Sequence, residues 1–403
     1  MIRSTIFLVA TVLLASACGS TKSPVLPPAE LVKLEEPVFV TRTWTLQAGD
    51  GAGHRWLKLT PAFSEDTGYT VDYAGNLLVF DLKTRDVLWR LELNERVAGG
   101  LTLADGRLLL GTSQGAVIAL DPANGKELWR ATVSSEVLSR PRSARGVVVA
   151  RTVDGKLYGL DAVSGKRLWI YQRSVPVLTL RGTAAPVIEG DVVISGFDSG
   201  NVIALGLTDG TVLWETPIAV ARGRTELERI IDIDGEPAVS DGVIYAVTYQ
   251  GRVAAVQFNT GRILWVRDLS AYSALALDRR NVYVSDAQGQ VWAVDRSSGA
   301  TVWKQDQLAR RELTGPALHD KYLVVGDFDG YLHWLDLDDG RLAARSRLNP
   351  NDDSDGDDEE DPRDFDEAVF GKARSIIARP FTRGITLFAI DRRGNLSAFI
   401  LES

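Results

Sequence analysis

Cysteine, methionine and histidine are scarce in this sequence, and their scarcity excludes several kinds of site. Among 403 residues there are one cysteine, one methionine and three histidines. Because Cys18 is the single cysteine, an internal disulfide and a cysteine-based zinc cluster are both excluded. The histidines His54, His319 and His333 share no metal-ligand spacing. His333 alternates with apolar neighbours in a strand-like run, so a structural role is expected for it.

Enzyme motifs and basic patches are missing as well. No Gly-x-Ser-x-Gly, Walker loop or His-Glu-x-x-His occurs, and the many carboxylates have no interpretable spacing. The formal charge of −8 is local, because residues 352–367 hold eleven carboxylates and one arginine, which leaves the rest nearly neutral. Without a basic patch, nucleic acid is not an expected partner. These absences predict a protein with no catalytic residues, no metal and no cofactor.

An apolar run near the N-terminus is too short to cross a membrane. It covers residues 6–17 and follows Arg3, whereas a spanning helix needs about 20 residues. Small residues then precede Cys18, as in the signals of bacterial lipoproteins, although the usual leucine lies one position early, at Leu14. We interpret residues 1–17 as a signal peptide and Cys18 as a lipidation site. An ordinary secretory signal with an incidental cysteine is the alternative.

The lipidated cysteine would hold the protein on a membrane, since several acyl chains together anchor firmly. Gly19 follows the cysteine, and by resemblance to bacterial sorting rules this favours the outer membrane, on its periplasmic face. Residues 18–40 contain four prolines and are interpreted as an extended tether. Residues 41–403 would form the folded domain.

One fifteen-residue phrase recurs along that domain. Its clearest copy is GAVIALDPANGKELW at residues 115–129, and the intervals between the closing tryptophans run from 38 to 51 residues. A seventh copy ends in Ala344 and an eighth starts at Gly394 and stops after one strand. The other copies span residues 75–89, 155–169, 200–214, 251–265 and 289–303. A period of this length with several short strands is typical of a β-propeller.

The phrase predicts the strands of one blade. A β-rich run precedes its opening glycine, which takes the positive φ of a hairpin turn. The alternating run that follows is a strand, and Asp-x-x-x-Gly makes a second hairpin in which the aspartate caps the turn, as at Asp121, Asp161, Asp295 and Asp336. Leu-Trp then opens the outermost strand. Upstream segments such as residues 184–188 and 315–318 supply the innermost strand, which completes four strands.

The two ends of the domain predict how the ring closes. The last copy lacks its outermost strand, while residues 41–47 contain a Leu-Trp-like strand that precedes any full unit. We therefore pair residues 41–47 with residues 395–401 as the eighth blade. The fold class is all-β: an eight-bladed propeller of four-stranded antiparallel blades, closed by pairing the N- and C-terminal strands.

The recurring tryptophans suggest a cofactor or sugar-stacking role at first sight. Their fixed place in each unit instead favours a wedge between neighbouring blades. Trp56, Trp292 and Trp334 lie outside the register and have no assigned role.

Two long connections predict a surface for a partner. Residues 170–182 and 215–233 flank one blade, cross from an outermost to an innermost strand, and should emerge on one face. The first contains Leu178, Leu180 and Arg181, and the second contains Asp232 and is followed directly by Asp234. Two exposed leucines beside an arginine, facing two carboxylates, would form a docking patch. The alternative is that the leucines pack inward and Arg181 pairs with Asp232 internally.

The acidic insert, residues 345–374, joins the seventh and eighth units and should lie on the same face. Residues 351–356 resemble the first half of a calcium loop, but Pro362 stands where a bidentate glutamate is needed. A solvated loop without a bound ion is the alternative.

The combined features are similar to those of the BamB family, lipoprotein subunits of the β-barrel assembly (Bam) machinery. The resemblance rests on the lipoprotein-type signal that ends at Cys18 and on the eight propeller phrases. It also rests on residues 178–182, 225–234, 243–246 and 326–334. It implies a scaffold that docks onto the periplasmic POTRA domains of BamA, with contacts carried over onto Leu178, Leu180, Arg181, Asp232 and Asp234. It also implies help with unfolded outer-membrane barrel precursors, through exposed strand edges.

Two rival functions follow from the same repeat. A periplasmic quinoprotein dehydrogenase shares it, but needs a quinone pocket with calcium and polar ligands at the propeller axis. A glycan-binding propeller would need stacking aromatics in the long loops, which are poor in them, with only Tyr171, Phe365 and Phe370.

Overall fold

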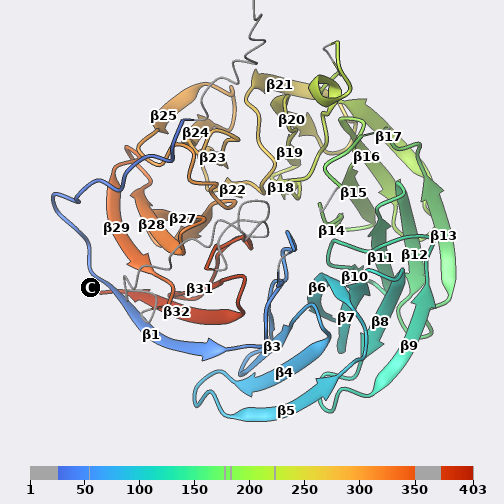
Figure 1. Ribbon diagram of the computed structural model, residues 1–403. Coiled ribbons are helices and arrows are strands. Elements are labelled where there is room, and N and C mark those ends of the chain that lie inside the picture. Colours follow the sequence, from blue (N-terminus) through green and yellow to red (C-terminus); the bar gives the residue numbers. More distant parts are fainter. Residues whose placement is uncertain are drawn as a thin grey trace, which may run out of the picture.

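The protein is a closed ring of eight four-stranded antiparallel sheets, arranged as the blades of a propeller (Figure 1). This computed structural model describes residues 26–53, 55–176, 178–181, 184–221, 224–349 and 374–402. Within each blade the strands follow chain order from the axis outward, except in the eighth. The predicted fold class is confirmed.

The first four blades lie between residues 62 and 217. Blade 1 contains β2 (Ala62–Phe63), β3 (Thr67–Val71), β4 (Asn76–Asp81) and β5 (Val87–Glu92). Blade 2 contains β6 (Val97–Ala104), β7 (Arg107–Thr112), β8 (Ala116–Leu120) and β9 (Glu127–Thr132). Blade 3 contains β10 (Arg142–Ala144), β11 (Val147–Thr152), β12 (Lys156–Asp161) and β13 (Arg167–Gln172). Blade 4 contains β14 (Val187–Glu189), β15 (Val192–Gly196), β16 (Asn201–Gly206) and β17 (Val212–Pro217).

The remaining blades complete the ring, with one 3-10 helix, η1 (Leu227–Arg229), in the connection between blades 4 and 5. Blade 5 contains β18 (Ala238–Ser240), β19 (Val243–Val247), β20 (Arg252–Gln257) and β21 (Ile263–Asp268). Blade 6 contains β22 (Ala276–Leu277), β23 (Asn281–Ser285), β24 (Val291–Asp295) and β25 (Thr301–Gln305). Blade 7 contains β26 (Ala317–His319), β27 (Tyr322–Gly326), β28 (Tyr331–Asp336) and β29 (Leu342–Arg347). Blade 8 contains β30 (Phe381–Arg383), β31 (Thr386–Ile390), β32 (Asn395–Leu401) and β1 (Val40–Gln47).

The repeated phrase forms the two hairpins that the sequence predicts. In blade 2, Gly115 and Gly125 adopt φ values of 78° and 74°, the left-handed region that glycine enters without steric cost. Asp121 Oδ1 accepts a hydrogen bond of 2.9 Å from the backbone N–H of Ala123, and so caps the second turn. Asp161, Asp295 and Asp336 accept equivalent bonds from the backbone of their own turns.

The innermost strands start later than predicted in two blades. β14 begins at Val187 and β26 at Ala317, whereas residues 184–188 and 315–318 were the expected strands. Pro186 and Pro316 stand just before these starts, and proline cannot donate a ladder hydrogen bond.

The ring closes as the sequence predicts. β1 pairs with β32 in antiparallel register, from Val40 opposite Leu401 to Gln47 opposite Asn395. The hydroxyls of Thr45 and Ser397 share a hydrogen bond of 2.7 Å across this seam. The N-terminal strand therefore supplies the outermost strand of blade 8 (Figure 1).

The recurring tryptophans pack between blades, which confirms the wedge interpretation. Trp129 Nε1 donates a 2.8 Å hydrogen bond to the carbonyl of Ala162 in the next blade. A Cβ on Gly165 would come within 2.6 Å of the Trp129 ring, so that turn needs glycine. Trp169, Trp214, Trp265 and Trp303 donate the same bond to Leu207, Phe258, Arg296 and Leu337, at 2.8 Å each.

The described part of the tether, residues 26–39, lies against the propeller. The N–H of Ala29 donates to the carbonyl of Ala309 at 2.9 Å, and that of Val38 donates to Ala343 at 2.8 Å. Leu31 and Leu34 pack against the buried cluster between blades 6 and 7. The chain thus reaches β1 along a fixed path over blade 7 (Figure 1).

Several sequence predictions lie outside the described residues. They are the signal peptide, lipidation of Cys18, residues 350–373 of the acidic insert and the calcium loop within it. In the part of the chain that the structure describes, no helix has the length and apolar character to span a membrane.

Candidate docking surface

The two long connections meet on one face of the ring. In each blade four antiparallel strands return the chain to the face where it entered, so all blade-to-blade connections share that face, called here the entry face. Residues 173–186 join β13 to β14, and residues 218–237 join β17 to β18. The backbone N–H of Leu180 donates to Asp232 Oδ2, which joins the first connection to the second. The predicted proximity of the two loops is confirmed.

Leu178, Leu180 and Arg181 form an exposed group, which we call the rim patch. Leu178 is 42% exposed and Leu180 is 40% exposed. Arg181 has a φ of 61°, and its backbone N–H donates to Thr179 Oγ1 at 3.1 Å. Isolated exposed leucines need no explanation, but a pair beside an arginine on a fixed loop resembles the centre of a binding surface.

The inward-packing alternative required an ion pair between Arg181 and Asp232, and Arg181 does not form it. Its guanidinium forms an ion pair with Glu136, from the connection between blades 2 and 3. Arg181 is largely exposed in this pair, so its screened charge contributes little to stability. The pair instead fixes the direction of the side chain, toward blade 2 and along the entry face.

Asp232 and Asp234 do not face the leucines across the surface, which corrects the predicted geometry. Asp232 is fully buried and Asp234 is 6% exposed. The reason is Ile233, which is fully buried and packs so tightly on β15 that a Cβ on Gly196 would come within 2.2 Å of it. The segment is therefore drawn into the body of the ring, where Asp232 supports the rim patch from beneath.

Burial also changes the pKa of Asp232. The pKa of Asp232 is raised to about 7, mainly by loss of water around the carboxyl and also by the nearby carboxylates of Asp198 and Asp234. The hydrogen bond from Leu180 and the guanidinium of Arg151 act in the opposite direction. Arg151 itself is held by Asp198 in a buried ion pair of 2.5 Å. The hydrogen bond that shapes the rim patch therefore depends on a carboxyl that titrates near neutral pH.

A hollow of about 570 Å³ opens beside the rim patch. Leu180 and Arg181 line it together with Trp56, Tyr249 and Arg55. Trp56 is 42% exposed there, and the Arg55 guanidinium lies 3.8 Å from the ring centroid of Tyr73. Trp56 was not predicted as part of this hollow because it lies outside the repeating register. Glu136 was missed because the connection that holds it carries no repeat, and no pattern marked Tyr249, in the turn between β19 and β20, as part of a site.

The remaining histidines have structural roles. His333 is fully buried, and its Nε2 lies 2.9 Å from Asp327 Oδ2. Burial lowers the pKa of His333, although Asp327 raises it in part. Trp334 Nε1 donates to His319 Nδ1 at 3.0 Å. His54 lies outside the described residues, and among those described no group of three His, Cys, Asp or Glu side chains is placed to hold a metal.

Comparison with known proteins identifies the family. A family model described as outer membrane protein assembly factor BamB matches residues 73–305. A protein of that name from Pseudomonas aeruginosa is 44% identical over 395 residues, which cover 98% of this chain and 98% of the relative. This chain belongs to the BamB family.

Other members of the BamB family agree in sequence and in structure. The BamB of Escherichia coli K12 is 33% identical over 350 residues, 84% of this chain and 89% of its own. The crystal structure of BamB from Moraxella catarrhalis matches with a TM-score of 0.77 and 25% identity, over 90% of this chain and all of that one. The resemblance inferred from the sequence is confirmed.

Quinoproteins share only the fold with this BamB-family chain. A quinohemoprotein alcohol dehydrogenase from Comamonas testosteroni matches with a TM-score of 0.67 at 12% identity, over 90% of this chain and 76% of that one. At that identity the match carries no information on activity.

Proposed function

We propose that this protein is a non-catalytic scaffold lipoprotein of the outer-membrane β-barrel assembly machinery, which docks onto the POTRA domains of BamA through the rim patch. Family membership supports the assembly role, because the relatives are named outer membrane protein assembly factors. The observation that carries the docking site is the pair of exposed leucines held by Asp232 beneath and Arg181 beside them.

The composition of the rim patch suits a protein partner. Covering the exposed parts of Leu178 and Leu180 would contribute about 1 kcal/mol each. Arg181 adds a charged group at the edge of the patch, and arginine is enriched among residues that dominate binding energy. The hollow beside Leu180, with Trp56 on its wall, can receive a side chain from the partner. Asp232 and Asp234 contribute by positioning the loop, because they are buried.

The proposal also covers location and clients. Lipidation at Cys18 would hold the protein at the periplasmic face of the outer membrane. Unfolded barrel precursors are proposed as transient clients, which would pair with exposed strand edges. The outermost strand β5 offers such an edge and carries exposed Val87 and Leu88.

Reversing the charge of Arg181 tests the docking site. Arg181→Glu removes a guanidinium from the patch and places a carboxylate beside Glu136, so capture of BamA should weaken roughly tenfold or more. The measurement is co-purification of BamA from detergent-solubilised membranes, with circular dichroism to verify the propeller.

Arg145→Glu is the matched control. Arg145 also has a left-handed φ, of 50°, and an exposed ion pair, with Asp191, but it lies in the β10–β11 turn on the opposite face. Capture by this variant should equal that of the unchanged protein. If folded Arg181→Glu captures as much BamA as Arg145→Glu, the rim patch is not the docking site.

A further inference from the structure

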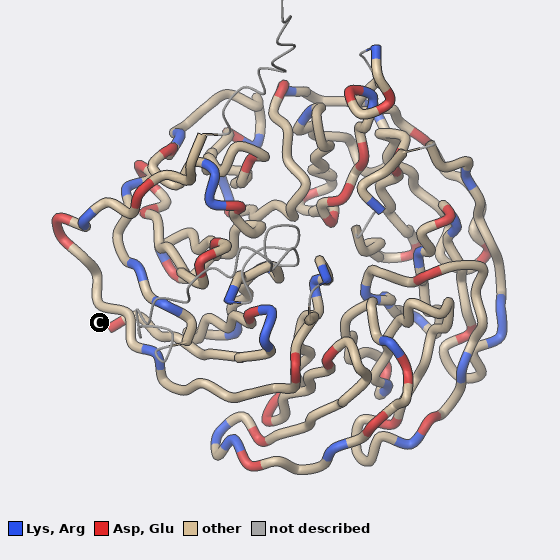
Figure 2. The backbone as a smooth tube through the Cα atoms, viewed as in Figure 1, with Lys and Arg blue, Asp and Glu red and all other residues tan. Residues whose placement is uncertain are grey.

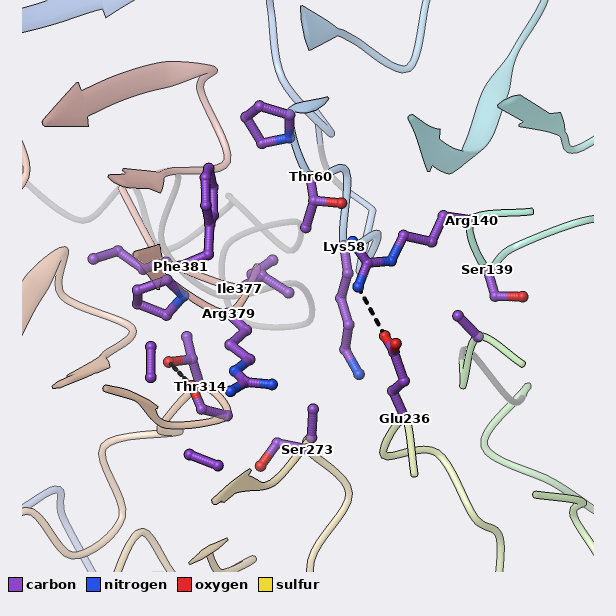
Figure 3. A pocket seen from close by; sticks show the side chains of 18 of the residues that line it. Lys58, Thr60, Ser139, Arg140, Glu236, Ser273, Thr314, Ile377, Arg379 and Phe381 are labelled. Carbon is purple, nitrogen blue, oxygen red and sulfur yellow. Dashed lines mark hydrogen bonds and ion pairs between the residues drawn. The ribbon is translucent and has the colours of Figure 1, made fainter. Parts of the chain in front are cut away.

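A cavity of about 750 Å³ lies on the propeller axis, and it shares Trp56, Lys58 and Asp234 with the wall of the hollow beside the rim patch. It is lined by segments that lead into the innermost strands of different blades, including Thr60 before β2, Arg140 before β10 and Arg379 before β30. Figure 3 shows side chains from these segments extending toward the centre of the same space. The apolar side chains of Phe63, Leu101, Leu103, Leu318, Ile377 and Phe381 form other parts of its wall.

Positive charge exceeds negative charge in this cavity. Five cationic side chains line it: Lys58, Arg140, Arg142, Arg379 and Arg383. Three carboxylates line it: Asp234, Glu236 and Glu312. The asymmetry is local, since the chain outside the acidic insert is nearly neutral.

One carboxylate serves two of the arginines. Glu236 accepts from Arg140 at 3.0 Å and forms a second ion pair with Arg142 (Figure 3 draws the first). Each guanidinium carries a full positive charge, so this trio keeps an excess of one. Burial lowers the pKa of Arg142, and so does the charge of Arg140, although Glu236 raises it.

Arg379 is the cation best placed for a ligand. It lines the cavity, and within the described chain no hydrogen bond or ion pair to it is found. Its side chain is exposed, and its pKa is lowered to about 10 by the net effect of partial loss of water and the charge of Arg140, with Glu236 opposing both. An exposed guanidinium at the cavity wall is open to direct pairing with an anion.

Hydrogen-bond donors without protein partners line the same cavity. The hydroxyls of Thr60, Thr102 and Ser139 and the Nε of Arg142 are buried, and within the described residues none has a hydrogen-bond partner. Buried donors are usually paired, but each of these four atoms has almost no accessible surface, so a ligand in the cavity would reach it only after its side chain rotates toward the cavity. An oxyanion supplies several acceptor positions on one small group.

We propose that the axial cavity binds a small organic anion through its carboxylate or phosphate oxygens, with Arg379 and Lys58 as the principal cations and the phenylalanine-lined wall covering its apolar part. The cavity is large enough for a molecule of a few tens of heavy atoms, within the usual range of ligand sites. The proposal does not depend on docking to BamA, because none of the three rim-patch residues lines this cavity.

Isothermal titration of the mature protein tests this proposal, with citrate and inorganic phosphate as separate probes in a low-salt Tris chloride buffer. Saturable binding of either probe is expected, at micromolar to millimolar concentration. Citrate binding with no phosphate binding would assign the site to carboxylates, and the reverse would assign it to phosphates. Absence of saturable binding for both probes overturns the proposal.

Two variants and one control locate the binding. Arg379→Gln and Lys58→Gln should each weaken the probe roughly tenfold or more, because each removes one charged donor. Using both variants keeps the test valid if one substitution disturbs folding, which thermal unfolding reveals. Arg145→Gln, which changes an arginine outside the cavity, should bind as the unchanged protein does. Equal binding by the folded cavity variants and the control overturns the proposal.

Discussion

At the level of single residues, Asp232 connects a buried group to the shape of an exposed loop. Its Oδ2 accepts the backbone N–H of Leu180, while its Oδ1 is buried and, among the described residues, has no hydrogen-bond partner. The carboxyl thus carries a charge where little surrounds it except Asp198, Asp234 and Arg151. The carboxyl of Asp232 is well placed to accept the hydrogen bond from the loop, but its negative charge lowers the stability of the folded protein.

This cost predicts a pH dependence. The pKa of Asp232 is raised from 3.8 to about 7 in the folded protein, so its contribution to stability is fully present below pH 3.8 and is lost as the pH rises through 7. Asp232→Asn keeps an acceptor for Leu180 and removes the charge. The difference in free energy of unfolding between the variant and the unchanged protein should shift in favour of the variant from pH 4.5 to pH 8, by an amount on the order of a few kcal/mol.

Urea unfolding at the two pH values measures this effect. Asp191→Asn is a suitable control, because Asp191 is an exposed carboxylate whose ion pair with Arg145 is solvated. Its difference from the unchanged protein should be small at both pH values. A difference for Asp232→Asn that is the same at pH 4.5 and pH 8 would show that Asp232 is already charged in both conditions.

At the level of elements, the strands of the blades were predictable because each one is specified locally. Alternating apolar residues set the strand, glycine with positive φ sets the turn, and the aspartate of the second hairpin caps it. These signals recur in copy after copy, so an ambiguous copy is interpreted through its neighbours. Even the seventh copy, which ends in Ala344, forms its outermost strand at the expected place.

The connections between blades were not predictable to the same degree. Their positions follow from the blades, but their side-chain directions depend on contacts between segments far apart in the chain. Ile233 draws Asp232 inward by packing on Gly196, and Arg181 turns to Glu136 in another connection. No local pattern encodes such contacts. The tether was likewise predicted as an extended segment, while its packing through Leu31 depends on blades 6 and 7.

The seam formed by β1 leads to a prediction at this scale. Deleting the eight residues of β1, Val40–Gln47, would leave β32 as an exposed outer edge and open the ring at blade 8. We expect the melting temperature to fall by about 5–10 °C and aggregation to increase. Differential scanning calorimetry and light scattering measure the two effects.

A synthetic peptide of residues 38–48 provides the control for this deletion. It carries the whole of β1 and should restore part of the lost thermal stability by pairing with β32. A scrambled peptide should have no effect. If the deletion variant melts at the same temperature as the unchanged protein and remains monomeric, the terminal seam does not stabilise the ring.

At the level of the whole molecule, the start of the described tether and the proposed docking face lie on the same side of the ring. The described tether begins beside the connection that leads from blade 6 to blade 7, where the carbonyl of Pro27 accepts from Arg310 Nε at 2.6 Å. That connection is on the entry face, as is the rim patch. Because Cys18 precedes Leu26 by eight residues, a lipid on Cys18 would hold this part of the ring within about 27 Å of the membrane.

Charged residues are distributed differently on the outer strands, in the axial cavity and at the rim patch. Along the outer strands and turns of the described chain, Lys and Arg positions are interspersed with Asp and Glu positions (Figure 2). The axial cavity departs from this pattern with its excess of cations, while the rim patch combines apolar and charged groups. The proposed protein site and the proposed anion site therefore differ in composition, although the hollow beside the rim patch shares part of its wall with the axial cavity.

The central claim is that the entry face of the ring, at the rim patch, contacts BamA. Site-specific photo-cross-linking in intact cells tests it most directly, with the cross-linker at Leu178 and, as the control, at Val163, which is 70% exposed in the β12–β13 turn on the opposite face. We expect a BamA adduct from Leu178 and none from Val163. An adduct from Val163 alone, or none from either position, would contradict the claim.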